Sequence, residues 1–364
     1  MTDRCDICLM DDSFPKFRKL SVGCNYCEIG KKRFYESKKV PEFQEYFKNV
    51  LNSKGQYQCI LGISGGVDSS YLALKLKEFN VRTLLIHVDC GWNTEIATKN
   101  IKMILDKTNF DYETIVPDWG LMKNLQLAYL KSGVYNQDVP QDHAFVSGMF
   151  KMAAKYNIRN MVSGHSSSTE NIPNLWQHDA MDLINIKSIG KAYKKHLNYS
   201  TYPSMNFFEY YLIYPFIKKI KFYTPLDSLD YSRDKALVTL KNNGYKQYSG
   251  KHGESSFTKY FQEVFLPDKY GLHKIKSHLS SLIINGEIDR RKAQKEYDNY
   301  CVNSKNERIK TLKFFCEKLD ITLEQYNDLF NENENLYSDY NNWDDLKKIM
   351  HIIKRPFKIK SHRS

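Results

Sequence analysis

The stretch Ser64-Gly-Gly-Val-Asp-Ser-Ser70 has the residue types of a loop that binds phosphate groups. It follows an apolar run at 57–63 with the length of a buried strand, and it precedes a helical pattern at 71–79. Glycines at such a turn let the backbone approach an anion closely, and the N–H groups and dipole of the following helix favour negative charge there. The residues that we expect to contact phosphate groups are Ser64, Gly65, Gly66, Ser69 and Ser70.

Asp68 stands inside this stretch, and its carboxylate would by itself repel a phosphate. Its presence is explained if it holds a Mg2+ ion between the carboxylate and the phosphate groups. The stretch is neither a Walker A loop nor a GxGxxG loop, because neither spacing is present. The sequence therefore predicts a magnesium–phosphate site of another type.

Four of the eight cysteines form two CxxC pairs near the start of the chain, Cys5 with Cys8 and Cys24 with Cys27. This spacing is typical of a four-thiolate zinc site. A disulfide pair or a redox dithiol is the alternative, and a cytoplasmic chain disfavours disulfides. Four protein thiolates leave no open position on the metal, so we expect the zinc to be structural.

In the first half of the chain, apolar runs of strand length alternate with segments that have the hydrophobic pattern of helices. Apolar runs at 57–63, 81–88, 112–116 and 160–163 are separated by helical patterns, the longest of them near 142–156. Alternation at these lengths predicts an α/β fold with a doubly wound parallel sheet. The ligand of such a sheet binds at the carboxyl ends of its strands.

Composition and charge limit the classes of protein. The 364 residues are 41% hydrophobic and carry a net charge of +12, which predicts a folded chain with an anionic partner. Nucleic acid and nucleotide-linked substrates both fit, and a solvated basic face is the alternative. No stretch approaches the ~18 apolar residues of a spanning helix. The first residues lack the apolar core of a signal peptide, so we expect a cytoplasmic protein.

In its strand–helix context, SGGVDSS resembles the pyrophosphate-binding loop (PP-loop) of the ATP-pyrophosphatase superfamily, whose fold is adenine nucleotide alpha hydrolase-like. GMP, NAD, asparagine and tRNA-lysidine synthetases belong to it; they cut ATP between its α and β phosphates and transfer AMP to a carbonyl oxygen. The resemblance implies ATP, with His87 and Val88 beside the adenosine. It also implies that Glu170, six residues after Gly164, holds Mg2+ with Asp68. A glutamate favoured by a helix dipole is the other interpretation of Glu170.

The stretch from 251 to 282 is similar to the C-terminal signature of the N-acetyl sugar amidotransferases of bacterial surface-polysaccharide and flagellar sugar pathways. With the cysteine pairs and the loop, this resemblance spans residues 5–293. One departure is Gly164-His165-Ser166, where family members often have Gly-Glu-Asn. The finer contact to ATP or to the acceptor is therefore expected to differ here.

This resemblance implies an ATP-dependent carbon–nitrogen ligase. It would convert the acetamido group of a nucleotide-activated N-acetyl sugar to an acetamidino group, through an adenylated imidate and ammonia, in lipopolysaccharide O-antigen or related glycan biosynthesis. His252 or Glu254 would deprotonate the incoming ammonium. Other residues that could face the acceptor are Ser255, Ser256, Thr258, Lys276 and His278, with a solvated helix face as the alternative for the last two.

A fused N-terminal glutaminase requires a cysteine at position two, where this chain has Thr2. Ammonia is therefore expected from solution or from a separate subunit. In the family that the chain resembles, it comes from a partner similar to the cyclase–glutaminase pair of histidine biosynthesis.

Two other functions stay open. A tRNA-modifying PP-loop ligase, of the thiolation or lysidine type, is favoured by the net charge and the cysteine pairs, although no CxxC follows Cys27. A non-catalytic scaffold is disfavoured, because a scaffold needs neither Asp68 nor Glu170. We expect a zinc ribbon at 1–40, a PP-loop domain at 41–268 and a helical region at 269–364 that packs on the core or on a partner. A capping box at Thr322–Gln325 marks one of its helices.

Overall fold

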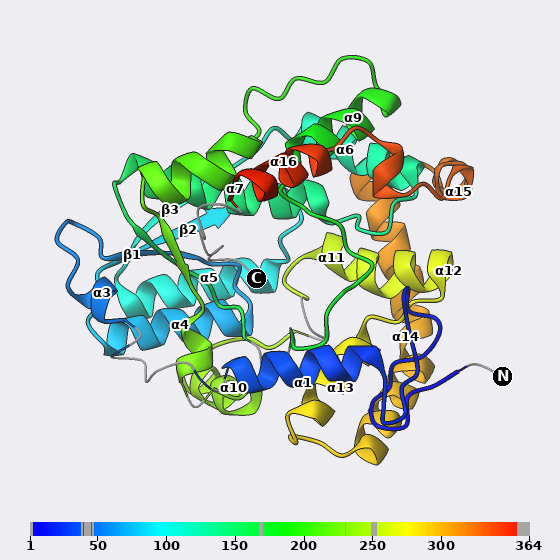
Figure 1. Ribbon diagram of the computed structural model, residues 1–364, viewed down its shortest axis with the longest axis horizontal. Coiled ribbons are helices and arrows are strands. Elements are labelled where there is room, and N and C mark those ends of the chain that lie inside the picture. Colours follow the sequence, from blue (N-terminus) through cyan, green and yellow to red (C-terminus); the bar gives the residue numbers. More distant parts are fainter. Residues whose placement is uncertain are drawn as a thin grey trace.

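A five-stranded parallel sheet lies at the centre of the molecule (Figure 1). The computed structural model describes residues 3–37, 39, 45, 47–166, 170–229, 231–248 and 253–354, with the backbone alone for 351–354. The strand order is β3-β2-β1-β4-β5, so the direction of the winding reverses at β1. The strands are β1 (Cys59–Gly62), β2 (Thr83–Val88), β3 (Asp111–Ile115), β4 (Asn160–Val162) and β5 (Lys221–Tyr223). The predicted doubly wound sheet is confirmed, and a ligand crevice is expected at the carboxyl ends of the neighbouring strands β1 and β4, where the winding reverses.

Helices cover both faces of the sheet because alternate strand residues point to opposite sides. Ile60 and Ile86 belong to one apolar cluster with Phe150 of α7, whereas Leu61 belongs to another with Leu72 of α4. No helix among the described residues is both long and apolar enough to cross a membrane. The helices are α1 (Asn25–Ser37), α3 (Lys48–Leu51), α4 (Val67–Glu78), α5 (Glu95–Thr108), α6 (Trp119–Ser132), α7 (Val139–Lys155), α9 (Leu183–Tyr193), α10 (Arg233–Asn242), α11 (Ser256–Tyr260), α12 (Leu266–Tyr270), α13 (Ile275–Ile284), α14 (Arg290–Leu319), α15 (Leu323–Glu332) and α16 (Asp344–Lys354), with π-helical segments η1 (Glu209–Ile217) and η3 (Phe261–Phe265) and 3-10 turns η2 (Pro225–Ser228) and η4 (Tyr337–Asp339).

Local sequence explains where several of these helices begin. The side chains of Thr94 and Ser232 accept hydrogen bonds from backbone N–H groups in the first turns of α5 and α10. Such caps satisfy donors that have no partner within the helix. The predicted capping box is confirmed at α15, where the Thr322 and Gln325 side chains each accept a hydrogen bond from the other residue's N–H.

The N-terminal segment that carries Cys5, Cys8, Cys24 and Cys27, called the cysteine module below, packs against α13 and the start of α14 (Figure 1). The N–H of Leu9 donates to Ser280 Oγ at 3.1 Å, and Lys276 Nζ lies 2.5 Å from Asp11 Oδ2. Arg290 donates to the carbonyl of Cys5 at 3.3 Å. Lys276, which could have faced the acceptor, thus binds the module instead.

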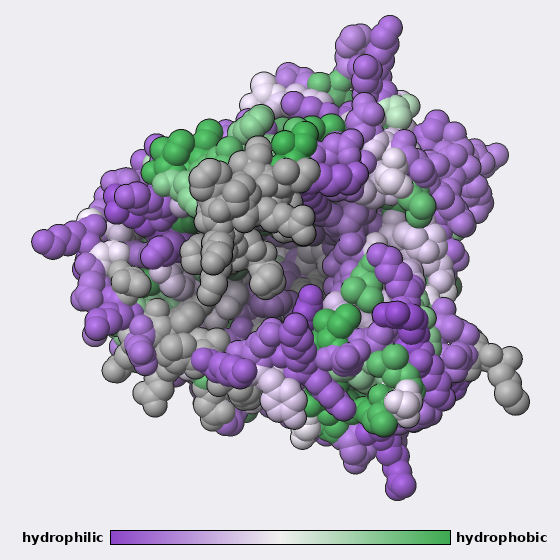
Figure 2. Space-filling view, viewed as in Figure 1, coloured by the Kyte–Doolittle hydropathy of each residue, from purple (hydrophilic) through white to green (hydrophobic). Residues whose placement is uncertain are grey.

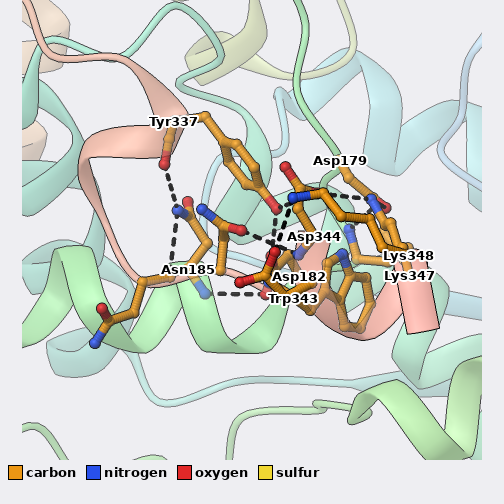
Figure 3. A network of polar contacts seen from close by, with 12 residues as sticks. Asp179, Asp182, Asn185, Tyr337, Trp343, Asp344, Lys347 and Lys348 are labelled. Carbon is orange, nitrogen blue, oxygen red and sulfur yellow. Dashed lines mark hydrogen bonds and ion pairs between the residues drawn. The ribbon is translucent and has the colours of Figure 1, made fainter. Parts of the chain in front are cut away.

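The sequence left open whether the C-terminal segment packs on the core or on a partner. In the structure it packs on the core of the same chain. Figure 3 shows Tyr337, Trp343 and Lys347 gathered around the start of α9. The Asp182 carboxylate accepts hydrogen bonds from Tyr337 at 2.5 Å and from the N–H of Trp343 at 2.8 Å. It also caps α9 through the N–H of Asn185 at 3.0 Å. One buried carboxylate therefore joins the C-terminal segment to α9.

Candidate functional site

The loop between β1 and α4 requires glycine at position 65 and passes close to a side chain at position 66. Gly65 has φ +77°, and a Cβ there would lie 2.4 Å from the carbonyl oxygen of Ala97. A Cβ on Gly66 would lie 2.9 Å from Glu254 Oε1. The loop therefore runs tightly between α5 and the segment that carries Glu254.

Hydrogen bonds hold this loop in place. Ser64 Oγ accepts from the N–H of Gly66 at 3.2 Å and lies 3.3 Å from Ser69 Oγ. On the other side of the loop, the Tyr245 hydroxyl donates to the carbonyl of Gly65 at 3.0 Å, and Asn100 donates to the same oxygen at 3.3 Å. The loop is thus fixed before any ligand binds, which is how an anion site avoids a large ordering cost.

A small pocket of about 260 Å3 lies over the loop and the first turn of α4. Asp68 and Glu170 both line it, so the structure brings together the two carboxylates expected to hold Mg2+. Carboxylate oxygens beside a phosphate loop are a donor set that suits this ion. The lining residues among those predicted are Ser64, Gly66, Asp68, Ser69, Gly164, Glu170 and Glu254.

Gly65 and Ser70, which were also expected to contact phosphate groups, are not among the residues that line this pocket. The side chain of Ser70 is fully buried on the inner face of α4, because its position in the helix turns it toward the sheet. The Gly65 backbone is instead occupied by its contact with Ala97 and by the bonds to its carbonyl.

The two carboxylates expected to hold Mg2+ have side-chain partners. Asp68 Oδ1 accepts a hydrogen bond from the Tyr231 hydroxyl, and Glu170 Oε2 lies 2.5 Å from His165 Nδ1. His165 therefore contacts one of the two carboxylates expected to hold Mg2+. Arg233, at the first position of α10, also lines the pocket and supplies a cation beside these carboxylates.

Gly164 lets the end of β4 approach the start of α4. A Cβ at Gly164 would lie 2.7 Å from the backbone nitrogen of Ser69 and 2.9 Å from the carbonyl carbon of Asp68. This close approach explains why a glycine stands six residues before Glu170 at the end of the strand.

A larger cavity of about 870 Å3 adjoins the small pocket and shares Ser64, His165, Glu170 and Glu254 with it. Figure 2 shows the surface hollowed above α1, with mostly hydrophilic residues at the rim. A volume near the upper end of the ~300–1,000 Å3 range of small-molecule sites leaves room for more than the nucleoside.

His87 and Val88 line the larger cavity at the end of β2. His87 Nδ1 lies 2.8 Å from the carbonyl oxygen of Ile63, and its Nε2 lies 2.7 Å from Asn93 Nδ2. The ring therefore donates through Nδ1 and accepts at Nε2, which is a neutral tautomer. Burial lowers the pKa of His87 in agreement with this arrangement.

Carboxylates cluster at the end of the cavity next to β2. Asp138 and Asp142 line it from the start of α7. Withdrawal from water, and then repulsion by Asp138, raise the pKa of the Asp142 carboxyl well above its ordinary value. Asp142 therefore holds its proton more tightly than an exposed carboxyl group does.

The segment that carries Glu254 runs beside the loop after β2. The N–H of Thr94 donates to the carbonyl of Glu254 at 3.0 Å, and Asn93 forms an antiparallel bridge with Ser255. Glu254 lines both cavities, and the hydroxyl of Tyr248 donates to its carboxylate. His252 and its neighbour at 251 lie outside the described residues.

The hydroxyls expected to contact a sugar are largely used within the protein. Ser255 caps α11, and Ser256 Oγ donates to the carbonyl of Trp92 at 2.9 Å. Thr258 Oγ1 donates to Asp138 Oδ1 at 3.3 Å, although its side chain lines the cavity. Ser255 and Thr258 thus line the cavity while they hold local structure, and Ser256 is not among the lining residues.

The cysteine cluster fits a zinc ion. The sulfur atoms of Cys5, Cys8, Cys24 and Cys27 lie within 4.8 Å of one another, and all four residues are buried. The separations of 3.5 Å between Cys5 and Cys27 and 3.9 Å between Cys8 and Cys24 bracket the ~3.8 Å expected between thiolates around a tetrahedral Zn2+. No disulfide joins them. A metal here would hold together a module with little core of its own.

Sequence reasoning missed several residues of the site. Arg233 lines the small pocket, and Tyr231 donates a hydrogen bond to Asp68 of that pocket; both residues follow an unpredicted strand, β5. Arg33 reaches the larger cavity from α1, far from the loop in sequence. No local pattern indicates these contacts, because each depends on long-range packing.

The chain thus has a doubly wound α/β fold, with a glycine loop where the winding of the sheet reverses and the carboxylates of Asp68 and Glu170 beside that loop. Residues 254–354 match a family model described as "LPS biosynthesis protein WbpG-like, C-terminal domain". This region of the chain is thus similar to a domain of lipopolysaccharide-biosynthesis proteins, as the resemblance to surface-polysaccharide proteins implies. No curated protein matches the chain.

Among solved structures, the chain is similar to an NMN synthetase from Francisella tularensis, with 13% identity over 78% of this chain and 96% of that chain and a TM-score of 0.39. It is also similar to an NH3-dependent NAD synthetase from Campylobacter jejuni subsp. jejuni, in complex with the nitrate ion. That match has 15% identity over 62% of this chain and 100% of that chain, with a TM-score of 0.29.

Proposed function

We propose that the protein is an ATP-dependent amidotransferase that converts the N-acetyl group of a nucleotide-activated sugar to an acetamidino group, in lipopolysaccharide or related glycan biosynthesis. One observation carries the proposal. The small pocket over the phosphate loop opens into a cavity that the WbpG-like region lines through Glu254, Thr258, Gln262, Lys274, Ser277, His278 and Ser281. The proposed phosphate site and the WbpG-like region thus line adjoining cavities, which supports a reaction between ATP and a sugar acceptor.

In the proposed reaction, the triphosphate of ATP binds over Ser64–Ser69. The loop N–H groups, the dipole of α4 and Arg233 stabilise the negative charge of the departing pyrophosphate. Mg2+, held by Asp68 and Glu170, would neutralise part of that charge. The adenosine lies beside His87 and Val88 in the larger cavity.

The acetamido oxygen of the acceptor attacks the α-phosphorus, and pyrophosphate leaves. Ammonia then attacks the imidate carbon, and AMP departs with the former amide oxygen. No protein nucleophile is needed, because adenylation activates the amide and the cavity holds the reactants together. The chain's own contribution is orientation and charge.

Glu254 is the residue that we assign to the ammonium. Its carboxylate lies against Gly66, next to the loop that would hold pyrophosphate, and Tyr248 orients it by a hydrogen bond. A carboxylate at this point attracts ammonium and accepts one of its protons, and the ammonia that results then attacks the imidate carbon. Ammonia comes from solution or from a separate glutaminase-type subunit.

The test is AMP formation from ATP by the purified protein with ammonium and each of several nucleotide-linked N-acetyl sugars, with bulk tRNA in parallel. We expect stimulation by a sugar, and loss of it in Asp68→Asn. Asp106→Asn, on the exposed side of α5, is the matched control and should keep full activity. Stimulation by tRNA alone would contradict the proposal and favour an RNA-modifying ligase.

A further inference from the structure

One wall of the larger cavity carries cationic residues and comes from parts of the chain outside the parallel sheet. Its described lining residues from α1, from 172–177 and from 274–281 include Arg33, Lys274 and His278, and they include no Asp or Glu. Lys274 is buried, with only 8% of its surface exposed. Its Nζ donates to Asn174 Oδ1 and lies 5.8 Å from the ring of Trp176. This wall therefore presents two cationic side chains, Arg33 and Lys274, to the cavity.

The packing of α1 explains why Arg33 faces this cavity. A Cβ on Gly30 would lie 2.9 Å from Ile284 Cδ1 and 3.0 Å from Ile172 Cδ1, so α1 rests with its glycine directly against these two residues. Arg33, three residues further along the helix, lies on the same face. The N–H of Ile172 donates to Ser281 Oγ at 3.2 Å, which ties the segment after Glu170 to α13. The wall is thus a packed unit.

The charges in the cavity are separated. Asp138 and Asp142 lie at the start of α7, next to the end of β2, whereas Arg33 and Lys274 belong to the wall formed with α13. Glu170 and Glu254 stand where the cavity meets the small pocket. A ligand with an anionic part and an uncharged polar part would be oriented by this separation.

We propose that Arg33 and Lys274 bind the phosphate groups of the acceptor, so that a nucleoside diphosphate carrier lies along the α1–α13 wall and the sugar points toward the phosphate loop. The inference rests on the proposed function and adds the residues that recognise the carrier. Guanidinium and ammonium groups are the usual ligands of phosphate groups. The cysteine module, by positioning α1, thereby contributes to acceptor binding.

Equilibrium binding tests this assignment without turnover. The protein is saturated with α,β-methylene-ATP and Mg2+ to fill the ATP site, and UDP-N-acetylglucosamine, UDP, GDP and dTDP are titrated by calorimetry. We expect Arg33→Ala to weaken binding of the diphosphates about 10-fold, and Arg33→Lys to restore part of it. Lys32→Ala, exposed on the same helix but away from the cavity, should bind as the wild type does.

The affinity for α,β-methylene-ATP itself should be unchanged in Arg33→Ala. Equal diphosphate binding by wild type and Arg33→Ala, an equal loss in Lys32→Ala, or no diphosphate binding by the wild type would each overturn the assignment. If diphosphates bind through Arg33 but no N-acetyl sugar supports AMP formation, the proposed function fails while the phosphate-binding wall stands.

Discussion

Gly164→Ala is the substitution that tests most sharply how the small pocket is assembled. The added Cβ would lie 2.7 Å from the nitrogen of Ser69, whereas ordinary contacts begin at 3.4 Å. The atoms that the Cβ would meet belong to the backbone of α4, and they cannot move aside as a side chain can. Removing the clash therefore requires the end of β4 and the start of α4 to move apart by about 0.7 Å. That shift changes the spacing between Asp68 and Glu170.

Two magnitudes follow from this geometry. Overpacking of this kind costs about 1–3 kcal/mol of unfolding free energy, which urea denaturation measures. A displacement of ~1 Å at reacting groups costs ~100-fold in rate, so we expect AMP formation to fall by about 10- to 100-fold. The affinity for Mg2+ and α,β-methylene-ATP, measured by calorimetry, should fall as well.

Gly120→Ala in α6 is the matched control, because its Cβ would meet only Asp118 Oδ1 at 3.2 Å and the site lies away from both cavities. It should keep full activity and nucleotide binding. If Gly164→Ala binds the nucleotide and forms AMP as the wild type does, the close approach of β4 to α4 has no part in the site, and our description of the pocket is wrong.

The remaining predictions concern single contacts. Tyr231→Phe removes the hydrogen bond that orients Asp68, so the Mg2+ concentration for half-maximal AMP formation should rise by about 10-fold; no change would contradict this role. Cys8→Ser should lower the metal content, measured by mass spectrometry, from one zinc per chain toward none, and unchanged zinc would refute the cluster. Asp182→Ala leaves buried donors without their acceptor and should cost about 1–3 kcal/mol in urea denaturation; no measurable cost would show that the C-terminal segment is loosely held. Burial lowers the pKa of His143 to about 4, so its neutral form favours the folded state; this stability is complete above pH ~6.5 and is lost as the pH falls toward 4, and His143→Gln should flatten the pH dependence of the urea midpoint.

The phosphate loop and the sheet were predictable because their signals are local. SGGVDSS sits between a strand and a helix whose periodicities are clear, and the two CxxC pairs have the spacing of one metal site. The capping box at Thr322 and Gln325 is equally local, and the structure contains it. These features need no knowledge of distant parts of the chain.

The walls of the site were less predictable, since they depend on packing between distant segments. Tyr231 lies 163 residues from Asp68 in sequence, and nothing near it marks a hydrogen bond to that carboxylate. Ser70 was expected at the phosphates because its residue type suits them, yet the turn of α4 directs it inward. Arg33 reaches the cavity only because Gly30 allows α1 to lie against Ile172.

Adenylation of the acetamido oxygen, the central step of the proposed reaction, predicts that this oxygen atom leaves with AMP. An acceptor labelled with 18O in its acetamido group, incubated with the protein, ATP, Mg2+ and ammonium, should give AMP that carries the label, together with an unlabelled acetamidino sugar. Mass spectrometry of both products reads this directly, since the amide oxygen must leave with AMP if it attacked the α-phosphorus. Unlabelled AMP, or label retained in the sugar, would contradict activation of the amide by adenylation.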